Sequence, residues 1–291
     1  MLIIGASGLI GRALAKSFAS KFDLIGTYYN HNYKPDYVKL RRLDLNNFAE
    51  IEDCLDDIHP AVVVHAAGLT DILFCEENNQ HAENVNYRAT AQLAAFCAQR
   101  AIRLIYLSTD MVFDGSQGNY KEDDTPAPIN QYGKSKFAAE EAIKSISANS
   151  VIARLNLIYG HAEALKKTFS DRILIANWAQ RSYGVFAGQI RSPLSIENAV
   201  RAIKLLADSE QTGIYHLGGA EQIDRWDFAL KIAAYLKLDP SIIEKADIPH
   251  NLKNIYPLNT SYDISKAQND LKTDFLSVED GLKLEYGKFL E

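Results

Sequence analysis

The sequence predicts an α/β protein built on a doubly wound parallel sheet, with a smaller C-terminal lobe. Three observations indicate this fold class. Short apolar runs alternate with longer amphipathic runs through the first half of the chain. The apolar runs are continuous, as in Ala61–Val64, and strands that are apolar on both faces belong in a parallel sheet covered by helices. A glycine-rich loop, Gly5–Gly11, directly follows the first apolar run.

Each element of the first half follows from its local pattern. Runs rich in β-branched, aromatic and leucine residues predict strands, and amphipathic runs between them predict helices. The expected strands are Leu2–Ile4, Phe22–Tyr28, Ala61–His65, Arg103–Leu107 and Ser150–Asn156, and the expected helices are Arg12–Ser20, Phe48–Ile58, Asn84–Gln99 and Tyr132–Ile146. The β-α-β repeat implies right-handed crossovers and ligands at the carboxyl ends of the strands.

The second half is less regular. Helices are expected at Glu197–Leu206 and Arg225–Leu236, a strand that rejoins the sheet at Gly213–Leu217, and an irregular, then helical, tail from Leu252. We therefore expect a dinucleotide-binding domain over residues 1–160, to which residues 191–219 return. Residues 161–190 and 220–291 would form the smaller substrate-binding lobe.

The composition excludes several classes of protein. The 291 residues are 47% hydrophobic and 23% charged with a net charge of -6, which is typical of a globular chain and argues against binding to nucleic acid or an anionic membrane. No apolar run is long enough to span a bilayer, and we expect no signal sequence, because the first strand begins at Leu2. The separated cysteines suit a reducing compartment, so we expect a cytoplasmic protein. The scattered histidines predict no metal site.

The loop Gly5–Gly11 predicts a dinucleotide site. Glycines after a first strand allow a tight turn, close approach of a pyrophosphate, and close packing of the helix that follows. The start of that helix offers free N–H groups and a positive dipole end to the anion. The expected cofactor contacts in the loop are Gly5, Ser7, Gly8, Leu9, Ile10 and Gly11.

The end of the second strand bears on which dinucleotide binds. An NAD site usually has an acid there, but the strand ends in Tyr28-Tyr29-Asn30. The basic residues that follow are His31, Lys34, Lys39, Arg41 and Arg42. They favour the 2′-phosphate of NADP(H) and leave NAD(H) open. Tyr28, Asn30, Asp44 and Leu45 are the residues expected near the adenosine.

Catalytic residues are expected at the end of the Arg103–Leu107 strand and at the start of the next helix. Tyr132 and Lys136 are four residues apart and lie on one helical face. The lysine, with an oxidised nicotinamide nearby, is expected to lower the pKa of the tyrosine toward the range for acid–base catalysis. The hydroxyl of Thr109, or of Ser108, would hold the reacting carbonyl oxygen.

Further motifs resemble the extended short-chain dehydrogenase/reductases, and within them the dTDP-4-dehydrorhamnose reductases. The first likeness rests on the glycine loop, His65–Asp71, Cys75–Asn78 and Val85–Asn86. The second rests on Ser108–Gly115, Tyr120–Glu122, Tyr132–Lys136, Arg191–Pro193, Gly213–Gly219 and Pro257–Thr260. The resemblance covers nearly the whole chain and implies a Rossmann-like fold.

The resemblance implies an NAD(P)H-dependent reductase of a 4-keto deoxysugar nucleotide, as in dTDP-rhamnose biosynthesis. Thr109 and Tyr132 would hold the keto oxygen, Tyr132 would donate the proton, and Lys136 would bind the nicotinamide ribose. The cofactor groove would include Ala66, Ala67, Gly68, Thr70, Asn86 and Ser108. The implied substrate contacts are Thr70, Asp110, Met111, Val112, Phe113, Asn156 and Arg191.

Two alternatives stay open. One is a sugar-nucleotide epimerase or dehydratase, in which Asp110 would supply an acid beside Thr109. The other is a cofactor-binding regulatory subunit that resembles the beta subunit of methionine adenosyltransferase. A nucleotide sugar is the expected small-molecule partner, and a homodimer is left open.

Overall fold

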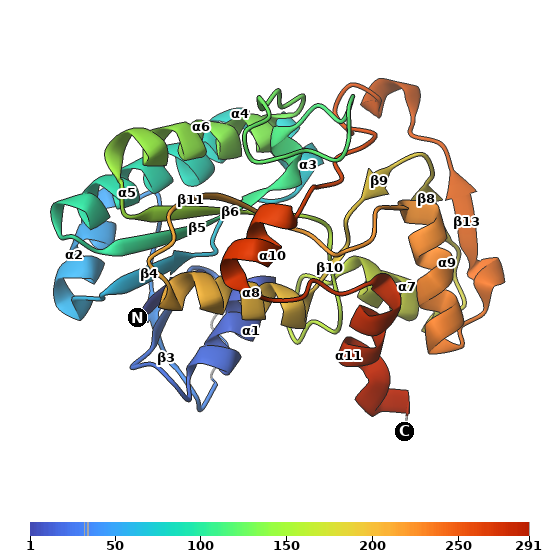
Figure 1. Ribbon diagram of the computed structural model, residues 1–291, viewed down its shortest axis with the longest axis horizontal. Coiled ribbons are helices and arrows are strands. Elements are labelled where there is room, and N and C mark those ends of the chain that lie inside the picture. The colour runs from blue at the N-terminus through green and yellow to red at the C-terminus, as the bar shows by residue number, and fades with distance from the viewer. Residues whose placement is uncertain (32, 34, 291) are drawn as a thin grey trace.

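In the part of the chain that the computed structural model describes, residues 1–31, 33 and 35–290, a seven-stranded sheet forms the centre (Figure 1). Its strand order is β11-β6-β5-β4-β1-β2-β3, and every neighbouring pair is parallel. The strands are β1 (Leu2–Ile4), β2 (Ile25–Tyr28), β3 (Lys39–Arg42), β4 (Val62–His65), β5 (Arg103–Thr109), β6 (Ser150–Leu155) and β11 (Gly213–Leu217). The predicted doubly wound parallel sheet is confirmed.

Helices cover both faces of this sheet (Figure 1). One face packs on α1 (Leu9–Phe18), α8 (Ile196–Asp208) and α10 (Ser265–Leu271). The other face packs on α2 (Phe48–Ile58), α5 (Ala89–Gln99) and α6 (Gln131–Ile146). Alternate residues of β1 enter the two cores, because Ile3 belongs to the first and Leu2 and Ile4 to the second. This two-sided burial explains the continuous apolar strands of the sequence.

A third apolar core lies beside the sheet, on the right in Figure 1. Phe169, Phe228 and Tyr159 are among the aromatic residues that pack in it. It is built from α7 (Phe169–Trp178), β8 (Tyr183–Phe186), α9 (Arg225–Leu236), β13 (Ile243–Ala246) and α11 (Val278–Leu290). Two short strand pairs lie between this core and the central sheet. They are β7 (Ile158–Tyr159) with β10 (Leu194–Ser195), and β9 (Ile190–Arg191) with β12 (Ile223–Asp224).

The first helices differ from the sequence prediction in their bounds. Helix α1 begins at Leu9 rather than Arg12, because Gly8 is the extended residue before it. The helix expected over Asn84–Gln99 is π-helical over Glu83–Arg88 and becomes α-helical only in α5. Two short helices precede it, α3 (Ile72–Glu77) and α4 (Asn79–Ala82).

Strand β3 was not expected from the sequence. Its residues, Lys39-Leu40-Arg41-Arg42, lack the apolar run that marks the inner strands. The strand lies at the edge of the sheet beside β2, where charged side chains reach solvent. The predicted basic stretch is therefore partly an edge strand; its Lys34 lies outside the described residues.

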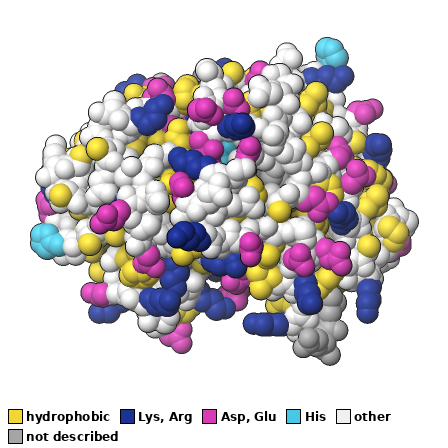
Figure 2. Space-filling model, viewed as in Figure 1, with side chains coloured by type: hydrophobic (Ala, Val, Ile, Leu, Met, Phe, Trp, Pro, Cys, Tyr) yellow, Lys and Arg dark blue, Asp and Glu magenta, His cyan; other side chains and the backbone are white. Residues whose placement is uncertain are grey.

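Charged side chains of both signs are interspersed over the face of the molecule in Figure 2. None of the described helices combines the length and the apolar character needed to cross a membrane.

Gly11 sets how closely α1 approaches the loop after β1. A Cβ atom on Gly11 would lie 2.0 Å from the carbonyl oxygen of Gly5. Gly5 itself has a φ of +85°, and a Cβ there would lie 2.7 Å from the backbone nitrogen of Ala67. These glycines allow the loop, the helix and the chain after β4 to pack closely.

We expect Gly11→Ala to lower the free energy of unfolding by about 2–3 kcal/mol, because backbone atoms must move to admit the methyl group. Gly184→Ala is the matched control, since its new Cβ would meet nothing closer than 3.8 Å; it should change that energy by less than about 0.5 kcal/mol. Urea unfolding measures both. Equal losses in the two variants would contradict the packing role of Gly11.

Candidate active site

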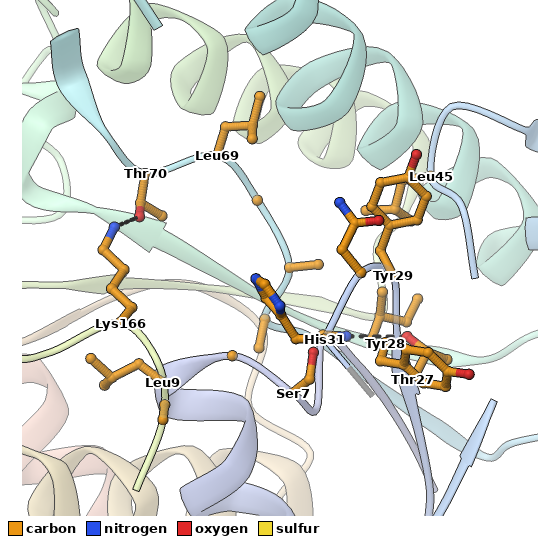
Figure 3. Close-up of a pocket in the computed structure, with 18 of the residues that line it drawn as sticks. Ser7, Leu9, Thr27, Tyr28, Tyr29, His31, Leu45, Leu69, Thr70 and Lys166 are labelled. Atoms are coloured by element: carbon orange, nitrogen blue, oxygen red, sulfur yellow. Dashed lines mark hydrogen bonds between the residues drawn. The ribbon is translucent and has the colours of Figure 1, made fainter. Parts of the chain in front are cut away.

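A groove of about 540 Å³ lies at the carboxyl ends of β1, β2 and β4 (Figure 3). This is the edge of a doubly wound sheet where ligands bind. The predicted cofactor residues that line it are Gly5, Ser7, Gly8, Leu9, Tyr28, Asn30, Leu45, Ala66, Ala67, Gly68 and Thr70. The structure thus brings together side chains and backbone from three separate strand ends.

The start of α1 presents its first N–H groups to the groove. Within the described part of the chain, no side chain caps this helix at Gly8. By contrast, α2, α6, α7, α8 and α9 are capped by the side chains of Asn47, Asn130, Thr168, Ser195 and Asp224. An uncapped helix start in a glycine cradle on a groove wall fits the pyrophosphate of a dinucleotide.

The far end of the groove is lined by Tyr28, Tyr29, Asn30, His31 and Leu45 (Figure 3). No Asp or Glu of the described residues lines this end. The basic residues that favoured NADP(H) do not all lie at this end of the groove.

Arg41 pairs with Asp57 of α2 at 2.7 Å, so its charge is engaged there. The guanidinium of Arg42 lies 5.2 Å from the centre of the Tyr29 ring, next to the groove.

The near end of the groove is closed by a segment from the second half of the chain, residues 161–167. Its Ala164, Leu165 and Lys166 line the groove, and the Lys166 ammonium donates to the Thr70 hydroxyl on the opposite wall (Figure 3). Behind that wall, Asn86 fixes the loop by bonding to both backbone groups of Leu69. Asn86 therefore shapes the groove from behind.

A second pocket, of about 470 Å³, adjoins the groove. Leu9, Thr70 and Lys166 line both spaces, so the two sites meet there. Among the described residues that line the second pocket there is no Asp or Glu. The cationic side chains in its wall are Lys166, Lys167, Arg172, Arg191 and Arg225, and the aromatic ones are Tyr132, Phe169, Phe186 and Tyr256.

Tyr132 and Thr109 meet at the wall of the second pocket. Tyr132 is at the start of α6, where Asn130 accepts a 2.7 Å hydrogen bond from the Gly133 backbone. Gly133 is needed for the close approach, because a Cβ there would lie 2.0 Å from the Met111 carbonyl oxygen. The hydroxyl of Thr109, at the end of β5, is near enough to Tyr132 to act on its pKa, and it donates to the Asp110 carboxylate at 3.2 Å.

Lys136 lies one turn beyond Tyr132 and is buried. Its ammonium donates to the Leu107 carbonyl oxygen at 2.7 Å and lies 4.0 Å from the centre of the Tyr106 ring. A Cβ on Gly68, in the groove wall, would lie 4.0 Å from it. Lys136 thus sits directly behind the groove.

The protein residues alone shift the pKa of Tyr132 upward, opposite to the direction expected from Lys136 and an oxidised nicotinamide together. Burial raises the pKa of Tyr132, and the neighbouring Thr109 hydroxyl offsets only part of that effect. Burial also lowers the pKa of Lys136 to about 7, while the Glu140 carboxylate raises it. Tyr132 is therefore a protonated phenol, which is the form that a proton donor needs.

Three predicted site residues at the end of β5 serve the structure instead. Ser108 donates to Glu140 at 2.5 Å, so its hydroxyl is engaged, which leaves Thr109 as the hydroxyl beside Tyr132. Val112 and Phe113 are fully buried in the sheet core, so they do not contact substrate.

Asp110 is also buried and fully engaged. Its carboxylate accepts from Thr260 at 2.5 Å and from Thr109 at 3.2 Å, and it pairs with Arg191 at 3.4 Å. Burial raises its pKa, while Arg191 lowers it. Arg191 lines the second pocket, but its guanidinium already pairs with Asp110 and donates to backbone carbonyls, including that of Pro257.

Other corrections concern residues that lie behind the walls. Asn156 is buried, donates to the Thr260 carbonyl and accepts from Ser192 N–H, so it joins two loops rather than facing substrate. Asp44 caps the turn at Asn46, and Ile10 packs on the sheet core. Of the predicted substrate contacts, Thr70, Met111 and Arg191 line the second pocket.

The sequence did not reveal the cationic residues Lys166, Arg172 and Arg225. They come from the stretches 161–190 and 220–291, where they lie outside every motif quoted for the resemblance. The one signal was the run Lys166-Lys167, which a sequence alone does not distinguish from a solvated loop.

The nucleotide-binding sheet, with Thr109, Tyr132 and Lys136 beside its groove, defines the class of extended short-chain dehydrogenase/reductases. Comparison with known proteins agrees with this. The chain belongs to the family described as the RmlD substrate binding domain, whose sequence model matches residues 1–284. The resemblance predicted from the motifs is confirmed, and with it the class of NAD(P)-dependent oxidoreductases.

Individual relatives span nearly the whole chain. A probable low-salt glycan biosynthesis reductase, Agl14 of Haloferax volcanii, is 29% identical over 96% of this chain and 95% of its own. Methionine adenosyltransferase 2 subunit beta of Pongo abelii is 28% identical over 92% of this chain and 81% of its own. The crystal structure of a hypothetical dTDP-4-dehydrorhamnose reductase from Sulfolobus tokodaii has a TM-score of 0.84 and 31% identity, covering 96% of this chain and 98% of that one.

We expect Lys136→Met to raise the free energy of unfolding by about 1–2 kcal/mol at pH 7, because a buried cation without a carboxylate partner is replaced by an apolar side chain. Below its folded pKa of about 7, Lys136 lowers the free energy of unfolding by the full amount. This destabilisation decreases as the pH rises toward the ordinary pKa of 10.5. The gain should therefore shrink between pH 7 and pH 9 in urea unfolding.

The same variant should weaken cofactor binding at least tenfold. A destabilised Lys136→Met protein with unchanged cofactor affinity would show that Lys136 is a structural residue only.

Proposed function

We propose that the protein is a reductase that uses NAD(P)H to reduce the keto group of a sugar nucleotide. The observation that carries the proposal is the junction of two pockets. A groove with a phosphate cradle meets a cationic pocket at Leu9, Thr70 and Lys166, and Tyr132 lies in the wall of the cationic pocket. A hydride donor in the groove and a carbonyl in the pocket would meet beside a phenol.

The residues of the groove divide the cofactor between them. The start of α1 and the loop Gly5–Gly11 would hold the pyrophosphate, and Tyr28, Asn30 and Leu45 the adenosine. When bound, the nicotinamide supplies the hydride. NADP(H) is favoured over NAD(H) because Arg42 lies next to the Tyr29 ring while no described acid lines that end.

The three residues at the junction act on the carbonyl. Thr109 and Tyr132 donate hydrogen bonds to the keto oxygen, which stabilises the negative charge that develops there. Tyr132 then transfers its proton to that oxygen. Lys136, behind the groove, donates to the ribose of the cofactor and stabilises the phenolate that Tyr132 becomes.

The charge of the second pocket supports a substrate with a diphosphate. Its cations have no described carboxylate in the same wall, and anions are attracted to such a site. The Nε atom of Arg225 is buried and has no hydrogen-bond partner among the described residues, and burial lowers the pKa of that guanidinium. A buried donor without a partner suits a phosphate oxygen.

The alternatives rest on less. Asp110 is bonded to Thr260, Thr109 and Arg191, so it is not a free acid for a dehydratase. The regulatory-subunit alternative keeps one specific observation, the similarity to methionine adenosyltransferase 2 subunit beta. Turnover separates the two functions, because a regulatory subunit binds the cofactor without consuming it.

The test is titration with NADPH and NADH by cofactor fluorescence, followed by addition of dTDP-4-keto-6-deoxyglucose and related keto-sugar nucleotides. We expect binding and then loss of NAD(P)H absorbance in proportion to the sugar reduced. Tight binding of cofactor with no oxidation by any keto sugar would contradict the reductase.

Tyr132→Phe should reduce kcat at least 100-fold and leave cofactor affinity within threefold, because it removes the proton donor and keeps the ring. Stopped-flow measurement of NADPH oxidation gives the rate. A variant with full activity would rule out Tyr132 as the acid.

Arg225→Gln should raise the KM for the sugar nucleotide about tenfold or more, with less effect on kcat, because a phosphate ligand contributes to binding rather than to the hydride step. Arg181→Gln is the matched control, since Arg181 is exposed and outside both pockets. Equal KM values for the two variants would remove Arg225 from the substrate site.

A further inference from the structure

Helix α6 presents a third ionisable residue on the face that carries Tyr132 and Lys136. Glu140 follows Lys136 by four residues, so the three side chains form one row toward the sheet. All three are buried. The reaction proposed above uses the first two, and it leaves the buried carboxylate of Glu140 without a role.

The contacts of Glu140 hold its carboxylate in one position. Its carboxylate accepts from Arg154 of β6 at 2.6 Å and 3.0 Å, and from the hydroxyl of Ser108 of β5 at 2.5 Å. Glu140 is 0% exposed and Arg154 is 1% exposed. Ser108 precedes Thr109, so the carboxylate also holds the strand end that carries the hydroxyl of the site.

Lys136 has no carboxylate within 4.0 Å among the described residues. Its partners are the Leu107 carbonyl and the Tyr106 ring, which are neutral. Glu140, one turn away, is the anion that favours its ammonium form, against burial. The described titratable groups around this row include His65 on β4, Tyr106 on β5, Arg154 on β6, His216 on β11, Cys75 on α3, and Asp110, Tyr262 and Glu122 outside the sheet.

We propose that Glu140 is a positioning residue of the reductase, whose buried carboxylate keeps Lys136 charged in the site and holds the Ser108–Thr109 strand end in place. The inference rests on the proposed function and adds a residue that touches neither ligand. The buried ion pair then contributes to catalysis, because Arg154 fixes the position of the Glu140 carboxylate and the negative charge of that carboxylate stabilises the Lys136 ammonium.

The charge of Glu140 is separable from its shape. Glu140→Gln keeps the size of the side chain and an acceptor for Ser108, but removes the negative charge. Lys136 then loses the anion that offsets its burial, and Arg154 remains as an unpaired cation nearby. Both changes disfavour the ammonium, so Lys136 should lose its proton at lower pH than in the wild type.

The experiment measures the Kd for NADH by fluorescence from pH 5.5 to pH 9, so that no 2′-phosphate titrates in the range. We expect the alkaline loss of affinity to shift in Glu140→Gln by about one pH unit to lower pH, which makes NADH bind about tenfold more weakly at pH 8 and within threefold at pH 5.5. Glu141→Gln is the matched control on the exposed side of the helix, where Glu141 pairs with Lys144. It should leave the profile unchanged.

Thermal unfolding shows whether each variant is folded at the assay temperature. Glu140→Asp is the second variant, because it keeps the charge with a shorter side chain, and its profile should stay within about half a pH unit of the wild type. A folded Glu140→Gln protein with the wild-type profile would overturn the inference. A Glu140→Asp profile that is shifted to lower pH as far as the Glu140→Gln profile would also overturn it, because Glu140→Asp keeps the negative charge.

Failure of the inference is distinct from failure of the proposed function. A wild-type protein that binds NADH but reduces no keto-sugar nucleotide contradicts the reductase, while the binding profiles still test Glu140. A wild-type protein that reduces the sugar, with identical profiles for Glu140→Gln and Glu141→Gln, contradicts only the role of Glu140.

Discussion

The position of the site depends on the buried ion pair between Glu140 and Arg154. The pair joins α6 to β6, and the Ser108 hydroxyl bonds to the same carboxylate from β5. The other end of Arg154 reaches His216 on β11, so one interaction spans a helix and three neighbouring strands. Loss of one partner of such a pair typically costs about 3–5 kcal/mol, because the other charge is left buried and alone. The row that carries Tyr132 is therefore held at a defined height above the strand ends.

The two pockets use opposite means to attract anions. The groove offers backbone N–H groups at the uncapped start of α1, at a fixed position set by close-packed glycines. The second pocket offers long cationic side chains, of which Arg225 retains a buried donor without a partner among the described residues. Backbone groups bind a constant part of a cofactor, whereas side chains from a variable lobe adapt to a particular substrate.

Most of the sheet and the grouping of Thr109, Tyr132 and Lys136 could be predicted from the sequence, because both depend on local signals. The continuous apolar strands, the loop Gly5–Gly11 and the Tyr132–Lys136 spacing each report on a few neighbouring residues. The edge strand β3 and the cationic wall of the second pocket could not be predicted from the sequence, since they depend on contacts between distant segments. The motif at Ser108–Phe113 shows the remaining difficulty: Thr109 faces the site, while Ser108 and Phe113 support it from the core.

In the proposed reaction a hydride crosses from the groove to a carbonyl in the adjoining cationic pocket. Transfer from NADPH deuterated at C4 of the nicotinamide, followed by mass spectrometry and NMR of the product, measures this step. We expect one deuterium per product molecule, on the former keto carbon and from one face of the nicotinamide only. Cofactor and nucleotide sugar that both bind while no deuterium reaches the sugar would contradict it and favour a regulatory protein.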